Sequence, residues 1–98
     1  MNPRHTLNML RVGQSALVEE IEAEPAMRRR LLDLGLIPGT RVTCIAKSPA
    51  GDPAAYLIRG AVIALRGKDA AGIQVGGLRE QELVRRGHTL VPFDEAAD

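Results

Sequence analysis

Apolar and polar side chains alternate between residues 16 and 21, and this pattern predicts the first strand of the chain. Its apolar positions are Ala16, Val18 and Ile21. The alternation breaks at Glu19-Glu20, which is typical of a β-bulge. The residues before this strand show no clear period. We expect that arm to attach to the core through a few apolar side chains, namely Leu7, Met9 or Leu10, and Val12.

A helical period replaces the alternation from residue 24 onward. Three apolar side chains recur at spacings of four and three residues and share one helical face: Met27, Leu31 and Leu34. Pro25 suits the first helical position, and Gly35 provides a C-terminal stop because glycine adopts positive φ freely. Pro38-Gly39 then matches the two central positions of a type II turn. The sequence therefore predicts one short helix followed by a chain reversal.

Four more strands are predicted downstream, at residues 40–47, 54–59, 61–66 and 73–75. The first of them is the clearest, because Val42, Cys44 and Ala46 occupy alternate positions. Residues 48–53 hold two prolines and a glycine and are expected to form an exposed connection. Gly60 joins the next two strands tightly. Their inward-facing side chains are expected to be Tyr56, Ile58, Ile63 and Leu65.

The end of this region carries two further signals. Residues 67–70 are predicted as a short helical turn, and Gly76-Gly77 as the end of the last strand. Several short strands separated by Gly and Pro turns are what a small closed barrel requires, because closure hides the strand edges. The predicted fold is mainly β: a small SH3-like five-stranded barrel with one short inserted α-helix.

The chain divides into a barrel domain, residues 1–77, and a C-terminal extension, residues 78–98. The extension has sparse apolar residues and nearly balanced charge, which indicates an appendage rather than a second core. Two alternatives are open for it: a segment without fixed structure, or a shield over one barrel edge. The side chains available for such a shield are Leu83, Val84, Leu90 and Val91.

Composition narrows the class of function. The 98-residue chain is 45% hydrophobic and 26% charged, as ordinary globular proteins are. A net charge of +1 disfavours a dedicated nucleic-acid protein, and an aromatic content of 2% excludes a base-stacking platform. The single cysteine excludes an internal disulfide and favours a reducing cytosol. No apolar run approaches the ~20 residues of a membrane-spanning helix, so we expect no direct membrane insertion.

The residues show no pattern for catalysis or metal binding. Cys44 lies on the alternating face of its strand, where a free cysteine packs as a small hydrophobe rather than acting as a nucleophile. His5, Cys44 and His88 are scattered singly, whereas metal ligands recur at short spacing. Four glutamates are interpreted as a solvated strand edge rather than as acid–base machinery: Glu19, Glu20, Glu22 and Glu24.

Gly67-Lys68 resembles the end of a phosphate-binding loop, but the rest of that motif is missing. The preceding glycine, Gly60, is too distant, and Asp69 stands where a Ser or Thr hydroxyl would bind magnesium. We therefore expect no catalytic residue, no metal site and no cofactor.

The predicted helix is the best candidate for contact with another protein. Leu32, Leu34 and Leu36 give its end more leucine than one narrow stripe can bury. Arg28 and Arg29 would form an electrostatic rim against an acidic partner. The alternatives are core packing for the leucines and a solvated face for the arginines. Weak self-association through the same surface is a further alternative.

Several blocks of the sequence resemble the ferrous iron transport protein A (FeoA) family. Three of them are RLLDLGLIPG at residues 30–39, SPAGDP at residues 48–53 and RGAVIALR at residues 59–66. Residues 13–16 and the segment from Asp69 to Val75 resemble that family's opening and closing parts. The resemblance covers residues 7–75, and blocks in order at compact spacing are more specific than any one of them alone.

The resemblance implies a small cytoplasmic SH3-like barrel that assists bacterial ferrous iron uptake and is not an enzyme. The partner it implies is ferrous iron transport protein B (FeoB), a membrane permease with a cytosolic GTPase domain. The chain would bind and regulate that permease, which would recruit it to the inner face of the membrane. The alternative function is a small-barrel accessory protein that binds nucleic acid or responds to metal.

Overall fold

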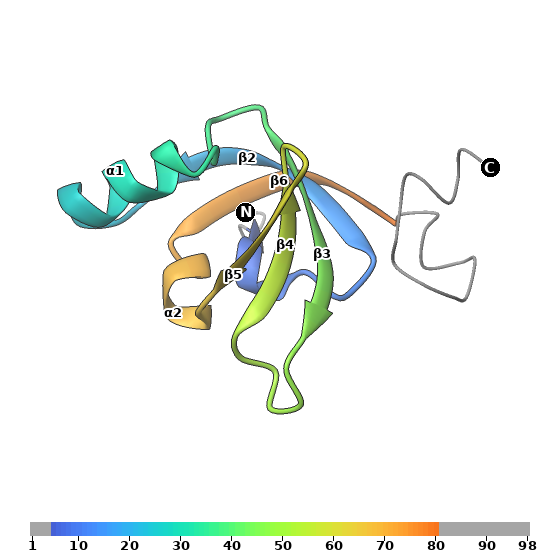
Figure 1. Ribbon diagram of the computed structural model, residues 1–98. Helices are drawn as coiled ribbons and strands as arrows, with labels where there is room; N and C mark the ends of the chain where they lie inside the picture. Colours follow the sequence, from blue (N-terminus) through green and yellow to red (C-terminus); the bar gives the residue numbers. More distant parts are fainter. Residues whose placement is uncertain (1–4, 81–98) are drawn as a thin grey trace.

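One antiparallel sheet of six strands, in the order β1-β6-β2-β3-β4-β5, organises the computed structural model, which describes residues 5–80 (Figure 1). The strands are β1 (His5–Thr6), β2 (Gln14–Ile21), β3 (Arg41–Lys47), β4 (Ala54–Ile58), β5 (Ala61–Leu65) and β6 (Ile73–Glu80). The helical segments are the 3₁₀ helix η1 (Leu7–Met9), α1 (Pro25–Asp33) and α2 (Gly67–Ala70). The mainly β architecture with an inserted helix is confirmed.

The sheet has six strands rather than the five expected. The additional strand is β1, in which His5 pairs with Val75 and Thr6 with Gln74 of β6. Two residues are too few to show an alternating pattern, so this strand exists only through its pairing with β6.

Strand β6 also extends beyond its predicted end. Gly76-Gly77 does not stop it, because β6 pairs with the long strand β2 as far as Glu80 opposite Gln14. Between the pairs Ser15–Arg79 and Leu17–Gly76, β6 carries one residue more than β2, so the irregularity at the glycines is a bulge in β6. Between the pairs Val18–Val75 and Glu20–Gln74 the extra residue lies in β2, at Glu19, which is the bulge that the sequence predicts. Residues 78–80 of the expected extension therefore lie in the sheet. The proposed edge shield of Leu83, Val84, Leu90 and Val91 lies outside the described residues.

The strands curve around a common interior, and η1 lies within that curve beside β6 (Figure 1). The largest fully buried side chains include Tyr56, Leu7, Leu10, Leu31, Leu36, Ile58, Ile73, Val18 and Val42. The N-terminal arm attaches through Leu7 and Leu10, whereas Met9 and Val12 are exposed. Cys44 is fully buried beside the core residues, as its place in the alternation predicts. Ala46 is exposed, because a register shift after Cys44 turns it away from the interior.

Two tight turns carry the chain reversals that the sequence predicts. Thr40 N–H donates to the Ile37 carbonyl at 2.9 Å, and Gly39 has a φ of +93°, as a type II turn requires. Between β4 and β5, Arg59 and Gly60 have φ values of 51° and 86°. Positive φ at both central residues is typical of a type I′ hairpin, whose twist matches that of the strands.

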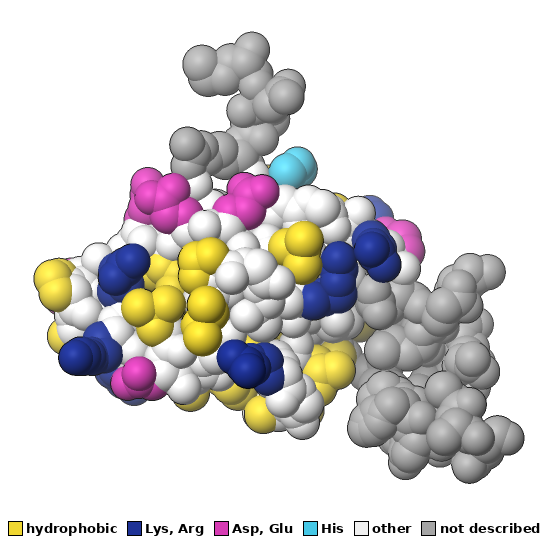
Figure 2. Space-filling view, turned by 90° about the horizontal axis from the view of Figure 1, so that it is seen from above, with side chains coloured by type: hydrophobic (Ala, Val, Ile, Leu, Met, Phe, Trp, Pro, Cys, Tyr) yellow, Lys and Arg dark blue, Asp and Glu magenta, His cyan; other side chains and the backbone are white. Residues whose placement is uncertain are grey.

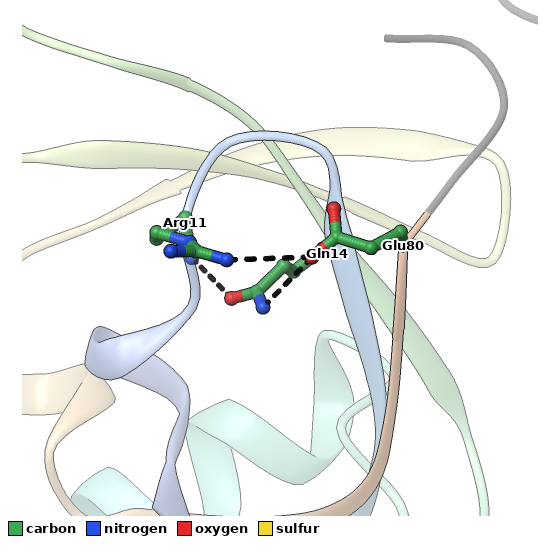
Figure 3. A network of polar contacts seen from close by, with 3 residues as sticks. All are labelled: Arg11, Gln14 and Glu80. Atoms are coloured by element: carbon green, nitrogen blue, oxygen red, sulfur yellow. Dashed lines mark hydrogen bonds and ion pairs between the residues drawn. The ribbon is translucent and has the colours of Figure 1, made fainter. Parts of the chain in front are cut away.

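The end of β6 is held at the surface by a small polar network (Figure 3). Gln14 Nε2 donates to Glu80 Oε2 at 3.1 Å, and Gln14 Oε1 accepts from Arg11 N–H at 2.8 Å. The Arg11 guanidinium lies 3.5 Å from the same Glu80 oxygen. Both side chains of this ion pair are mostly exposed, so the network stabilises the strand end only weakly.

Candidate partner-binding surface around helix α1

Helix α1 is attached to the core along one narrow face. Pro25 occupies the first turn, where its fixed φ and missing N–H cost nothing. Leu31 is fully buried, and Met27 is half-buried against the core. The helix otherwise extends beyond the end of the sheet (Figure 1), so its three consecutive arginines, residues 28–30, are all exposed.

The chain leaves α1 through a motif that returns it to the core. Gly35 has a φ of +109°, its N–H donates to the Leu32 carbonyl at 2.9 Å, and Leu36 N–H donates to the Leu31 carbonyl at 3.1 Å. This is a Schellman motif, in which the residue after the glycine packs against the last turn of the helix. Leu36 is accordingly 0% exposed. The expectation that Leu36 contacts a partner is therefore wrong, because its side chain is buried in the core.

The other four predicted contact residues lie at or near the surface. Arg28, Arg29 and Leu32 line one shallow groove along α1, with Leu32 half-buried at its base. Leu34 is 42% exposed and lies in a second groove. The structure thus brings the two arginines together with Leu32 and places Leu34 apart from them.

The second groove lies between α1 and the segment from β5 to α2. Its apolar lining includes Met27, Leu31, Leu34, Ala64 and Leu65, and its charged lining is Arg30, Arg66 and Asp69. The contact residues predicted from the sequence include none in β5. The signal was present, because an inward Ile63 and Leu65 imply an outward Val62. Val62 is 62% exposed.

Charge is distributed unevenly over this region. Figure 2 shows apolar side chains gathered on the half of the upper face over α1, with Lys and Arg side chains at the margins. Ile37, 43% exposed, adds to the apolar surface just after the helix. Glu22 and Glu24 precede the helix and are exposed. The surface thus combines exposed apolar side chains with a local excess of positive charge on α1, which suits an acidic, partly apolar partner.

In the described part of the chain, the reactive side chains form neither a metal-binding cluster nor an activated nucleophile. Among residues 5–80, no three His, Cys, Asp or Glu side chains gather in a way that could hold a metal ion. Burial raises the pKa of the Cys44 thiol, which disfavours the thiolate that nucleophilic attack and metal ligation need. Within the same residues, no helix is long and apolar enough to cross a membrane.

The fold and the exposed helix define a small SH3-like β domain with an inserted surface helix. The FeoA domain family matches residues 5–76, and the chain belongs to the FeoA family. The solution structure of FeoA from Chlorobium tepidum is 39% identical with a TM-score of 0.70, covering 74% of this chain and 69% of that one. The crystal structure of FeoA from Stenotrophomonas maltophilia, described as a prokaryotic SH3 domain protein complexed with zinc, is 31% identical with a TM-score of 0.71. It covers 79% of this chain and 98% of that one.

A relative that is far longer than this chain links the family to a transporter. The Fe(2+) transport protein A/Fe(2+) transporter FeoB fusion protein of Porphyromonas gingivalis is 33% identical over 69 residues. The match covers 70% of this chain but only 8% of that protein. Membership of the FeoA family connects the chain with ferrous iron transport, as the resemblance implies.

Proposed function

We propose that this chain is a non-enzymatic accessory protein of ferrous iron uptake that binds the Fe(2+) transporter FeoB and regulates it. The observation that carries the proposal is the fusion protein of P. gingivalis, which joins a region similar to this chain with the transporter in one polypeptide. Fusion holds two domains at a high effective concentration, an arrangement that suits domains acting on one another.

The surface around α1 is the proposed contact. Arg28 and Arg29 supply positive charge, and Leu32 and Leu34 supply apolar area on either side of the helix. Leu36 contributes indirectly, because its burial fixes the path of the chain after the helix. Binding would place the chain in the cytoplasm at the inner face of the membrane. The charge of α1 directs this contact toward an acidic region of the transporter.

The test is binding of the purified chain to FeoB in lipid nanodiscs, with and without GTP, with the GTP hydrolysis rate recorded in the same samples. We expect saturable binding at micromolar concentrations or tighter, with a hydrolysis rate or an affinity that depends on the nucleotide. Empty nanodiscs are the control for adsorption to lipid. The absence of binding in every nucleotide state would contradict the proposal.

A further inference from the structure

Strand β5 ends the sheet and leaves one long edge open. It pairs with β4 on one side, from Ala61 opposite Ile58 to Leu65 opposite Ala54. Among residues 5–80, no strand pairs with its other side. Open edges are usually protected by charged residues, proline or a bulge, but β5 has the sequence AVIAL and a regular register with β4.

The hairpin geometry decides which peptide groups face outward. In a two-residue type I′ hairpin, the closing pair, here Ile58 and Ala61, is hydrogen-bonded across the strands. Because the pattern alternates, Ile63 and Leu65 also direct their peptide groups toward β4. Val62 and Ala64 direct their N–H and C=O groups to the open edge. Both residues are exposed, Val62 by 62%.

The open edge adjoins the second groove described above. Met27, Leu31 and Leu65 give that groove an apolar base, and Ala64 belongs to both the edge and the groove lining. Arg30 and Arg66 line it as well, with Asp69 as the acidic residue of the lining. An extended peptide pairing with β5 would direct alternate side chains into this groove.

We propose that the outer edge of β5 binds an extended acidic and apolar segment of the FeoB transporter as an added strand. This inference rests on the proposed function and specifies how the contact is made. Hydrogen bonds to Val62 and Ala64 supply the backbone pairing, and the groove between α1 and β5 receives apolar side chains. Arg30 and Arg66 favour carboxylates on the segment.

A second copy of this chain fits the same edge less well. In antiparallel pairing of two β5 strands with Val62 opposite Ala64, Arg66 of each copy lies opposite Gly60 of the other, and the β5 sequence AVIAL brings no acidic side chain to the edge. A second copy therefore offers its own arginine and no carboxylate to Arg30 and Arg66 of the groove. The charges therefore select an acidic partner segment over self-pairing.

Proline at position 62 tests the added strand directly. The outward N–H of Val62 is not used by the β4–β5 ladder, so Val62→Pro removes a docking donor and leaves the internal pairing intact. We expect it to weaken FeoB binding in nanodiscs about tenfold or more, the effect of losing about 1.4 kcal/mol. The matched control is Val62→Thr, which keeps the N–H and the β-branched shape and should change the dissociation constant less than about threefold.

Amide hydrogen exchange supplies a second measurement that needs no variant. The Val62 and Ala64 amides should exchange quickly in the free chain and slow about tenfold or more in the complex with FeoB. If Val62→Pro does not fold, Arg66→Glu replaces it, with Lys68→Glu as the control of equal charge outside the groove. The Arg66 variant should lose affinity, and the Lys68 variant should keep it.

The outcomes separate this inference from the function on which it rests. Binding of FeoB without protection of the two amides, or with full affinity for Val62→Pro, overturns the added strand and leaves the proposed function standing. Protection of the same amides in the free chain also overturns it, because another segment or a second copy then occupies the edge. Failure of the unmodified chain to bind FeoB would contradict both the added strand and the proposed function.

Discussion

Gly35 sets the direction in which the chain leaves helix α1. Its φ of +109° lies in the left-handed region, which L-residues with a side chain rarely adopt. A Cβ added there would lie 3.0 Å from Arg59 Cδ and 3.4 Å from Ile58 Cγ2. The backbone conformation therefore requires the glycine, and an added Cβ would in addition make the Arg59 side chain shift by a few tenths of an ångström.

Gly35→Ala should lower the free energy of unfolding by about 1–2 kcal/mol, since a side chain at positive φ is strained. Gly39→Ala is the matched comparison, because Gly39 also has positive φ but an added Cβ meets no atom within 4 Å. We expect Gly35→Ala to cost more than Gly39→Ala in urea unfolding followed by circular dichroism. Equal costs would show that the contact with Arg59 does not matter.

Tyr56 links stability to pH at the residue scale. Burial, followed by the charges of Cys44 and Asp52, raises the pKa of its phenol from 10.0 to about 12. A raised pKa means that the folded chain holds this proton more tightly than the unfolded chain. The stabilisation is complete below the unfolded pKa near 10 and is lost as the pH rises toward 12. Burial raises the pKa of the Cys44 thiol as well, which acts in the same direction.

We therefore expect the urea midpoint to fall as the pH rises above 10, and Tyr56→Phe to reduce that dependence. Tyr56 is the single tyrosine and the chain has no tryptophan, so ultraviolet absorbance reports its ionisation directly. The phenol should titrate near 12 in the folded chain and near its ordinary value in urea. The same midpoint in both states would contradict the assigned effect of burial.

At the scale of elements, the sequence predicts those structures that carry a period of their own. Strands β3, β4 and β5 each place one face in the core, so their alternation marks them to within a residue or two of their ends. The bulge at Glu19-Glu20 was visible because it interrupts such a pattern. Strand β1 and the continuation of β6 depend on pairing between distant segments, which leaves no local trace.

Whether each candidate site residue is exposed or buried was also predictable only where a local period decides it. Arg28 and Arg29 are exposed because helical spacing keeps them off the buried stripe. Leu36 was misassigned because its place depends on the Schellman motif. A glycine at the helix end followed by leucine is the sequence signature of that motif, and it was the signal that could have identified Leu36 as a core residue. The open edge of β5 could not be predicted without the strand order.

The contact proposed for α1 yields a prediction at the scale of elements. Leu34→Asp should weaken binding to FeoB about tenfold or more, because it removes apolar contact area from the groove and its carboxylate repels an acidic partner segment. Val12→Asp is a matched control, since Val12 is 40% exposed against 42% for Leu34 and precedes the first residue of β2, whereas α1 follows the last. Circular dichroism should show both variants folded. Full affinity of the Leu34 variant would remove this residue from the contact.

At the scale of the whole molecule, charge is nearly balanced but spatially divided. The chain carries 13 Lys and Arg against 12 Asp and Glu. Three arginines are consecutive on α1, whereas four glutamates lie within residues 19–24 just before it. The fields of opposite charges so close together largely cancel at longer range, and physiological salt screens the remainder beyond about 8 Å. We therefore expect such a molecule to attract a short acidic segment placed against α1 better than a long polyanion.

The separation of the arginines of α1 from the glutamates of residues 19–24 predicts how the chain discriminates between acidic partners. A 20-nucleotide single-stranded DNA offers charge without apolar side chains, and we expect no saturable binding to it below about 100 μM at low salt. FeoB binding should weaken only about tenfold between low salt and ~0.5 M salt, because apolar contacts are insensitive to screening. Fluorescence anisotropy with the DNA and a salt titration of the nanodisc complex measure both. Tight, steeply salt-dependent DNA binding would instead identify the arginines of α1 as a phosphate-binding surface and support the nucleic-acid alternative.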